Sequence, residues 1–311
     1  GDYDVDGVTS VATLFLYLRS KGVPVDYYIP ERTSEGYGMN EDAVRRIAAG
    51  GTSLIITVDT GITAVEEIAL ASSLGVDTVV TDHHECREAL PEAEAVVDPK
   101  QPDSSGVGTA LAGVGVAFKL VCAMDGDADK MLARYGDLVA VGTVADVMPL
   151  LGENRFITRC GLQKIAAGDC RPGFLALAEE AGVRDKPFTA STVGFSLEPR
   201  INAAGRLGEP GLAVRLLEET DLRRARVLAA ELCAKNRERQ ALETEIWREA
   251  VERLHGEQPD APIVLGRLAS RRDRHRRLAP DGRLQRPRGD DLSGRRERQG
   301  LLPQHRLLQS L

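Results

Sequence analysis

Two short apolar runs in the first hundred residues each end at an acidic residue, and a helical pattern separates them. Residues 53–58 (Ser-Leu-Ile-Ile-Thr-Val) precede Asp59, and residues 76–81 precede Asp82. Runs that are apolar throughout, rather than alternating, are typical of strands buried on both faces of a sheet. Strand, helix and strand in this order predict an α/β fold: a doubly wound parallel sheet covered by helices on both faces.

The neighbouring segments extend this pattern. We expect helices at 8–21, 40–49 and 64–74, and further strands at 23–29 and 93–97. Asn40 is a good N-cap for the second of these helices, and Gly75 is a typical C-terminal stop for the third. The last strand also ends at an acidic residue, Asp98.

After Asp98 the pattern becomes mainly helical. We expect helices at 107–123 and 131–144, a loop at 197–208 and a strand starting at 261–265. A charged amphipathic stretch without Gly or Pro at 221–254 predicts a long helix that connects two domains. This order predicts a helical part that follows the sheet, and then the beginning of a second α/β domain.

Acidic and histidine side chains lie where the predicted strands end. Ligands of parallel α/β sheets bind beyond the carboxyl ends of the strands, so Asp59 and Asp82-His83-His84 should lie at one edge. We expect Asp2, Asp4 and Asp6 to follow a first strand that this chain lacks. Carboxylates gather divalent metal ions, and an imidazole among them shifts the preference from Mg²⁺ toward Mn²⁺.

Each motif also has a simpler interpretation. The first three aspartates could form a Ca²⁺ loop, but the twelfth position, which such a loop fills with glutamate, is Thr13 or Phe15. Val-Asp-Thr-Gly around Asp59 could belong to an aspartic protease, which needs a second such motif that the chain lacks. Asp146 alone could be a helix cap.

The remaining motif, Asn202 with Arg206, could be a glycine turn beside a surface charge. An arginine close to metal-binding carboxylates instead suggests a phosphate in the substrate. Adjacent histidines at a strand end are rarely both core residues, so His83 and His84 favour a ligand site. Because all five motifs occur together in this order, they favour one site for two metal ions.

Composition narrows the class of protein. The formal net charge of −7 argues against a protein that coats nucleic acid over a wholly basic surface, although a local basic groove remains compatible with it. The five cysteines form no Cys-x-x-Cys pair, so we expect reduced thiols rather than disulfides or a zinc site. No apolar run is long enough to span a bilayer, and we expect no membrane association.

The motifs together resemble those of the DHH phosphoesterase superfamily, and within it those of single-strand-specific exonucleases. The resemblance runs from residue 1 to about 265 and is carried by residues 2–10, 58–62, 81–85, 142–150, 200–208 and 236–243. It implies a metal site for two Mn²⁺ or Mg²⁺ ions with the ligands Asp4, Asp6, Asp59, His83 and Asp146. It also implies that Asp59 is shared between the ions and that Asp2 orients the first loop.

The resemblance further implies that Arg206 and Asn202 bind the scissile phosphate, and that His84 either supports a ligand or faces the substrate. The implied activity is a cytoplasmic, monomeric 5′→3′ exonuclease that degrades single-stranded DNA to 5′-mononucleotides in recombination and repair. A single-strand-binding protein and a helicase are implied partners. The alternatives are a DHH enzyme acting on oligoribonucleotides, cyclic dinucleotides or phosphoadenosine phosphate, and an inactive DNA-binding fragment.

The resemblance also predicts the domain organisation. We expect a catalytic domain at 1–218, a connecting helix at 219–257 and the start of a DHH-associated domain at 258–311. Residues 266–311 contain thirteen arginines, no lysine and five acidic residues, and they lack the pattern of that domain. We expect 267–311 to be translated out of frame and poorly ordered; a natural arginine-rich tail that binds the DNA backbone is the alternative.

Overall fold

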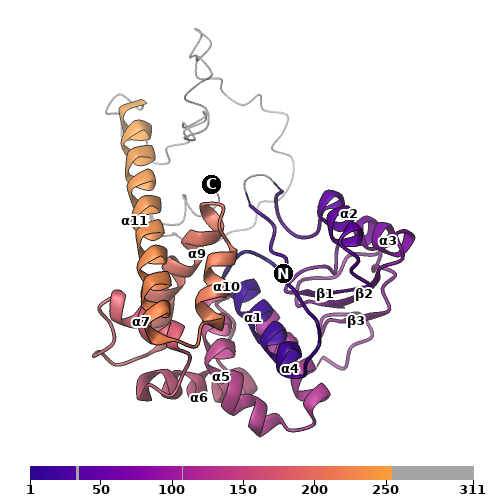
Figure 1. The fold of residues 1–311 in the computed structure, drawn as a ribbon, viewed down its shortest axis with the longest axis horizontal. Coiled ribbons are helices and arrows are strands. Elements are labelled where there is room, and N and C mark those ends of the chain that lie inside the picture. Colours follow the sequence, from indigo (N-terminus) through magenta and orange to yellow (C-terminus); the bar gives the residue numbers. More distant parts are fainter. Residues whose placement is uncertain (33–34, 107, 254–311) are drawn as a thin grey trace, which may run out of the picture. The chain divides into compact units, whose positions relative to one another are not determined.

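The computed structural model describes residues 1–32, 35–106 and 108–253 (Figure 1). The chain divides into two compact units, Gly1–Leu242 and Glu243–Leu311. The first unit holds every residue that the sequence assigned to the site. The predicted strand at 261–265, the second domain and the arginine-rich tail lie outside the described residues.

A parallel sheet of three strands organises the first hundred residues. The strands are β1 (Leu54–Val58), β2 (Asp77–Thr81) and β3 (Ala95–Val97), and they lie side by side in this order. Val58 pairs with Thr81, and Thr81 pairs with Val97. The three strands therefore end at the same level, and the predicted parallel sheet is confirmed.

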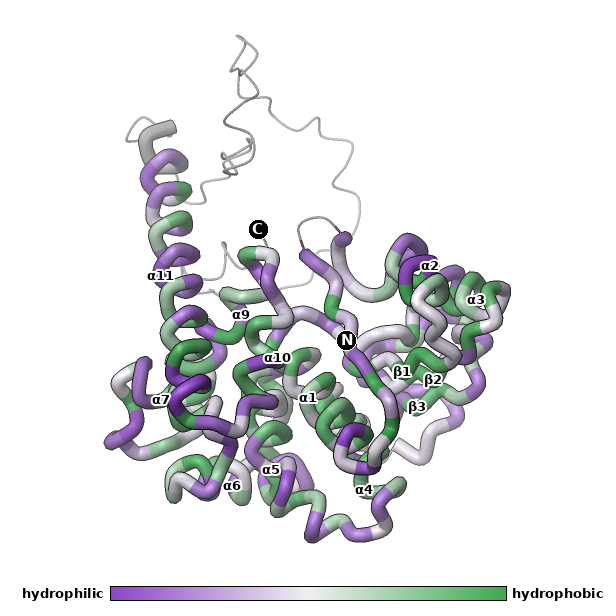
Figure 2. The backbone as a smooth tube through the Cα atoms, in the orientation of Figure 1, coloured by the Kyte–Doolittle hydropathy of each residue, from purple (hydrophilic) through white to green (hydrophobic). Residues whose placement is uncertain are grey.

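Helices cover both faces of this sheet, as predicted. Val58 and Ile56 face a large core that includes α1 (Val5–Ser20) and α4 (Gly113–Asp125). Ile55 faces a smaller core with α2 (Glu41–Ala49) and α3 (Val65–Ser73). Figure 2 shows apolar colouring along the strands and α1, in contrast to the mixed colouring of α11. The N-terminal end of β1 is less buried than its apolar sequence suggested, because Leu54 lies on an edge strand and is 45% exposed.

The helical part packs against α1 and α4 through the same large core. Its central helix is α5 (Ala128–Ala145), whose second half is buried along nearly its whole length. The other helices are α6 (Gly152–Ala167), α7 (Pro172–Glu180), α8 (Ala190–Thr192), α9 (Glu198–Arg206), α10 (Gly211–Glu218) and α11 (Leu222–Arg253). A π-helical turn, Val193–Leu197, leads into α9. The long helix predicted at 221–254 is confirmed for its described part.

Two predicted elements were wrong. Residues 23–29 form no strand, because they pair with none of the three strands of the described sheet. Residues 197–208 were expected to be a loop, yet most of them form α9. Pro199 lies in its first turn, where a proline costs no hydrogen bond, and buried Ala203 and Ala204 favour the helix. The glycines that suggested a turn, Gly205 and Gly208, lie at and beyond its end.

One predicted helix starts later than expected. The pattern at 107–123 becomes α4 only at Gly113, where the side chain of Asp6 meets the first backbone amides of the helix. Within the described ranges, no helix has both the length and the apolar content needed to cross a membrane.

Candidate metal centre

The first loop and the start of α1 supply two carboxylates with different surroundings. Asp4 is the N-cap of α1, and its Oδ1 accepts a hydrogen bond from the amide of Gly7 at 3.0 Å. Asp6 lies in the first turn and is almost fully buried. Its two oxygens accept hydrogen bonds from the amides of Gly113 (2.6 Å) and Val114 (2.9 Å) at the N-terminus of α4. The positive end of the α4 dipole therefore stabilises the carboxylate of Asp6.

Asp59 follows β1 in a left-handed conformation, with φ of 56°. Aspartate tolerates this region better than most residues, and the turn directs its side chain across the end of the sheet. Gly113 leaves the room for it, because a Cβ on that glycine would lie 2.5 Å from Cβ of Asp59 and 2.6 Å from its Oδ1. The N-terminus of α4 thus packs closely against both Asp6 and Asp59.

The histidine pair at the end of β2 is held by Asp82. This buried carboxylate accepts hydrogen bonds from the amides of Ile62, His83 and His84 and from Nδ1 of His84, at 2.7–3.3 Å. Although burial acts to raise its pKa, these hydrogen bonds, led by that of His84, hold the pKa of Asp82 below its ordinary value. Asp82 therefore fixes the loop that presents His83 and His84.

The orientation of His83 points one ring nitrogen into the carboxylates. Its Nδ1 lies 3.1 Å from the carbonyl oxygen of Leu111. Since a carbonyl can only accept, Nδ1 is the donor of this hydrogen bond, which leaves Nε2 as the ring nitrogen that could bind a cation. Nε2 lies 3.1 Å from Asp59, and 3.7 Å from both Asp6 and Asp146. A backbone carbonyl that fixes the tautomer in this way is typical of a metal-binding histidine.

Asp146 reaches the site from the helical part. It is the C-cap of α5, and its Oδ2 is buried without a hydrogen-bond partner among the described residues. The sequence could place Asp146 only at a helix end. The packing of α5 against α1 and α4 brings it to the sheet edge.

Three overlapping groups of side chains could each hold a cation, with ligand atoms all within 4.8 Å of one another. Two of the groups share His83 and two share Asp59, so all three form one continuous centre. Their members are Asp59, His83 and His84; Asp6, His83 and Asp146; and Asp2, Asp4 and Asp59. The structure thus brings together all five predicted ligands.

Burial and mutual repulsion raise the pKa values of the carboxyl groups in this centre. Burial, followed by the charge of Asp59, raises the pKa of Asp6 well above its ordinary value. Burial, followed by the charges of Asp4 and Asp2, does the same for Asp59. Burial is also the main cause of the raised pKa of Asp146. Crowded buried carboxylates with an unpaired oxygen and an inward imidazole nitrogen are a donor set that fits divalent cations.

Two residues of the centre, Asp2 and Asp82, were not among the metal ligands that the sequence predicted. Asp2 was expected to orient the first loop, yet its carboxylate lies with those of Asp4 and Asp59. Burial, followed by the charge of Asp4, raises the pKa of Asp2 to about 7. Asp82 was expected at the sheet edge but was given no role there, although its position directly before His83 in the motif was a usable signal.

The family comparison matches this region. The model of the DHH family, N-terminal domain, matches residues 1–143. Residues 1–143 therefore form a DHH-family domain. The matched part of this DHH domain contains the first loop, the sheet and both histidines, while Asp146 lies three residues beyond it.

Several curated relatives of this DHH chain share one name. The single-stranded-DNA-specific exonuclease RecJ of Bacillus subtilis is 44% identical over 266 residues, which are 85% of this chain and 33% of that protein. RecJ of Escherichia coli is 44% identical over 264 residues, 81% of this chain and 46% of that protein. A crystal structure of exonuclease RecJ bound to manganese superposes with a TM-score of 0.72 at 38% identity, covering 84% of this chain and 65% of that one. The DHH chain therefore spans a third to a half of these curated relatives.

Two predicted residues of the DHH chain lie on α9, beyond the family match. Asn202 binds the start of α1: its Oδ1 accepts the amide of Val5 at 3.1 Å, and its Nδ2 donates to Glu198 at 3.3 Å. Arg206 ends the helix, where its charge acts on Tyr3 and Glu198. α9 can approach the first loop closely because a Cβ on Gly205 would lie 2.5 Å from the carbonyl oxygen of Tyr3. A phosphate-binding role for Asn202 and Arg206 stays a prediction.

Of the two predicted site histidines, His84 is the more exposed. Its Nδ1 is bound by Asp82, and this hydrogen bond is the main cause of its raised pKa. Its Nε2 lies 3.3 Å from the hydroxyl of Tyr37. Tyr37 therefore borders the centre on the open side of His84, a neighbour that the sequence did not suggest.

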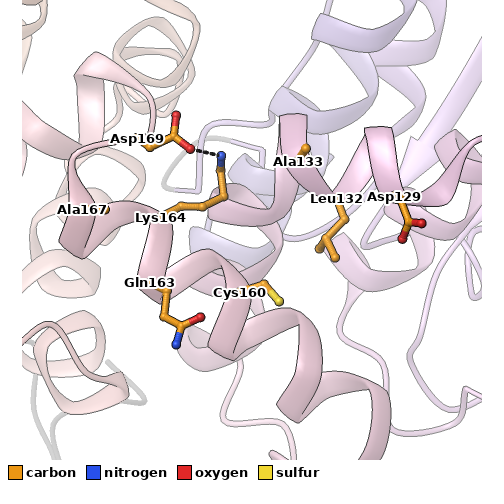
Figure 3. Close-up of a pocket in the computed structure, with 8 residues that line it drawn as sticks. All are labelled: Asp129, Leu132, Ala133, Cys160, Gln163, Lys164, Ala167 and Asp169. Carbon is orange, nitrogen blue, oxygen red and sulfur yellow. Dashed lines mark hydrogen bonds and ion pairs between the residues drawn. The ribbon is translucent and has the colours of Figure 1, made fainter.

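A separate hollow lies between α5 and α6, shown in Figure 3. Leu132, Cys160 and Gln163 line it, and Lys164 pairs with Asp169 across 2.8 Å at its rim. It contains none of the predicted site residues, and its cysteine is one of five free thiols. We assign it no function.

Proposed function

We propose that the chain carries the catalytic centre of a metal-dependent 5′→3′ exonuclease that hydrolyses single-stranded DNA to 5′-mononucleotides. The observation that carries this proposal is the convergence of Asp6, Asp59 and Asp146 on Nε2 of His83. The similarity to RecJ proteins supports the choice of substrate.

The donor set supports two divalent ions, Mn²⁺ or Mg²⁺. The residues that would hold them are Asp4, Asp6, Asp59, His83 and Asp146, and the position of Asp2 makes it a further donor. Such ions, when bound, lower the pKa of a water molecule and neutralise charge on the phosphoryl oxygens.

The other residues position the predicted metal ligands or supply charge to the substrate. The Leu111 carbonyl and the α4 amides fix His83 and Asp6 in advance, so little reorganisation is needed when a substrate binds. Asn202 holds the backbone of the first loop through Val5. Arg206 would supply positive charge to the scissile phosphate, and His84 is open enough to face the substrate.

The biological setting belongs to the same proposal. We infer action on single-stranded DNA during recombination and repair, by a monomer in the cytoplasm, with a single-strand-binding protein and a helicase as partners. The five free cysteines support a reducing compartment.

The direct test is hydrolysis of a 5′-labelled oligodeoxynucleotide by the 311-residue chain with Mn²⁺. Labelled mononucleotide should appear from single strands and not from duplex, and Asp146→Ala should abolish it. The matched control is Asp169→Ala, which removes an exposed carboxylate of the helical part. Turnover restricted to oligoribonucleotides, cyclic dinucleotides or phosphoadenosine phosphate would favour another DHH activity. DNA binding without turnover would favour an inactive fragment.

A further inference from the structure

A lysine follows the third strand of the sheet, at the edge that carries the metal centre. The amide of Lys100 donates to Oδ1 of Asp98 at 2.8 Å, and Asp98 is almost fully buried. Nε2 of Gln101 donates to the carbonyls of Val96 and Asp98, at 3.0 and 3.3 Å. The backbone after β3 therefore forms a fixed turn beyond the carboxyl end of the strand, where ligands of parallel sheets bind.

The side chain of Lys100 extends to the histidine motif. Its Nζ lies 3.2 Å from Oε1 of Glu85, which directly follows His84 in the sequence. Burial raises the pKa of Asp146, and the charge of Lys100 is one of those that act to lower it. The ammonium group of Lys100 is thus close to both the histidine motif and the ligand from α5, although Lys100 is not itself a predicted ligand.

The charge balance of the centre requires cations outside the ligand set. The charge of two divalent ions would be balanced by the carboxylates among the predicted ligands, which are Asp4, Asp6, Asp59 and Asp146. A filled centre would therefore have no surplus positive charge to attract a nucleic acid. Contacts of Lys and Arg with phosphates supply most of the affinity of proteins for a nucleic-acid strand. Lys100 is a cation in a position to make such a contact.

Lys100 and Arg206 approach the centre from different elements. Figure 1 shows α9, which ends at Arg206, to the left of the N-terminus and β3 to its right. Since Arg206 is expected to bind the scissile phosphate, Lys100 is left for another phosphate of the same strand. Its partner Glu85 has a side chain that is 85% exposed, and ion pairs with so exposed a member contribute little. A phosphate can therefore replace Glu85.

We propose that Lys100 binds the phosphate next to the scissile one and that this phosphate displaces Glu85. This inference rests on the proposed function. The chemical group recognised is a backbone phosphate, which lies either at the 5′ end of the strand or on the 3′ side of the scissile bond. Lys100 would thereby hold the strand in register with the metal ligands without touching the reacting atoms.

The first test measures binding of fluorescent oligodeoxythymidylate to the 311-residue chain, with Ca²⁺ in place of Mn²⁺ to slow hydrolysis. Each phosphate contact with a single strand adds about 0.7 to the slope of log K against log salt concentration. Lys100→Gln should therefore reduce this slope by about 0.7 and raise Kd about three- to tenfold. Glu85→Gln should lower Kd about two- to fivefold, because Lys100 is then unpaired in the free protein.

A matched ion pair on the helical part provides the controls. The side chains of Lys164 and Asp169 are 23% and 80% exposed, close to the 24% and 85% of Lys100 and Glu85. This pair borders the hollow in Figure 3, which contains no predicted site residue. Lys164→Gln and Asp169→Asn should leave slope and Kd unchanged. If Lys164→Gln reduces the slope as much as Lys100→Gln does, net charge explains the effect and the inference is wrong.

A second test separates phosphate binding from an effect of Lys100 on Asp146. Hydrolysis with Mn²⁺ is compared for dTpdT, which has only the scissile phosphate, for pdTpdT, which adds a 5′-phosphate, and for dTpdTpdT, which adds a phosphodiester on the 3′ side. Lys100→Gln should lower kcat/KM for one of the two longer substrates, mainly through KM, and leave dTpdT unchanged. The substrate that responds identifies the side on which the phosphate lies.

An equal loss on all three substrates would mean that Lys100 acts through the ligand Asp146, and it would overturn the inference while the proposed function stands. An unchanged salt slope for Lys100→Gln would overturn it as well. A parent chain that hydrolyses none of the substrates would count against the proposed function, and the salt slope would still decide whether Lys100 binds a strand phosphate.

Discussion

Replacing Gly113 with alanine should damage the fold and the metal centre together. A Cβ at this position would lie 2.5 Å from Cβ of Asp59 and 2.6 Å from its Oδ1, and neither group can move freely. Asp59 is buried in a left-handed turn, and the Gly113 amide is bound to Asp6. The helix must therefore shift away from the sheet edge or push Asp59 out of the cluster.

The size of the effect follows from overpacking a buried contact, which costs about 1–3 kcal/mol. A loss of about 2 kcal/mol should lower Tm by roughly 4–8 °C in a domain of this size. Metal binding should weaken as well, because Asp59 is displaced. The stabilisation by a ligand that binds only the folded state grows with the logarithm of its concentration over its Kd, so the Mn²⁺-induced rise in Tm should be smaller. The assay is thermal unfolding in EDTA and across a Mn²⁺ titration.

Gly136→Ala is the matched control for this prediction. Gly136 is also a buried helical glycine, but a Cβ there would meet only the flexible end of Leu132, at 3.1 Å. Alanine should be neutral, or stabilising by up to about 1 kcal/mol, because it favours a helix. If Gly113→Ala keeps both the parent Tm and the parent response to Mn²⁺, the close approach of α4 to Asp59 is wrong.

Three further changes test the surroundings of the centre. Asp2 has an ordinary pKa of 3.8 and a folded pKa of about 7, so its charged form opposes folding; the metal-free protein should lose stability as pH rises between these values, by up to about 4 kcal/mol. In EDTA, Asp2→Asn should unfold at increasingly higher urea than the parent from pH 4 to pH 8, and a constant difference would contradict this. Asp82→Asn should lower the free energy of unfolding, measured in urea, by about 1–3 kcal/mol and should weaken the Mn²⁺-induced gain in Tm. The reason is that one accepting oxygen is replaced by an NH₂ group that faces other hydrogen-bond donors. Asn202→Leu should cost a similar amount by leaving the Val5 amide unpaired; normal stability with reduced turnover would instead favour a substrate-binding role.

The sequence alone determined the sheet and most of the residues that meet in the candidate centre. Apolar runs that end at Asp59 and Asp82 were sufficient to predict parallel strands, because local pattern and buried position agree there. Parallel strands end at one edge, so residues that follow them must meet. The predicted helix cap Asn40 acts through a neighbouring amide, which is local in sequence.

Some local patterns gave the wrong element. The glycines and polar residues near Asn202 suggested a loop, but burial of Ala203 and Ala204 against the core favours a helix. Residues 23–29 had a strand-like composition, yet a strand forms only where another strand pairs with it. In both places tertiary contacts overrode local preference.

Tertiary structure decided how the ligands are oriented and which other residues hold them. Nothing in the sequence indicated that the Leu111 carbonyl would set the tautomer of His83, or that the α4 amides would bind Asp6. Gly113 looked like an ordinary helix residue until its distance from Asp59 was known. These contacts join segments more than twenty-five residues apart, so they depend on how the helices pack. The predicted ligands, in contrast, could be recognised from short motifs.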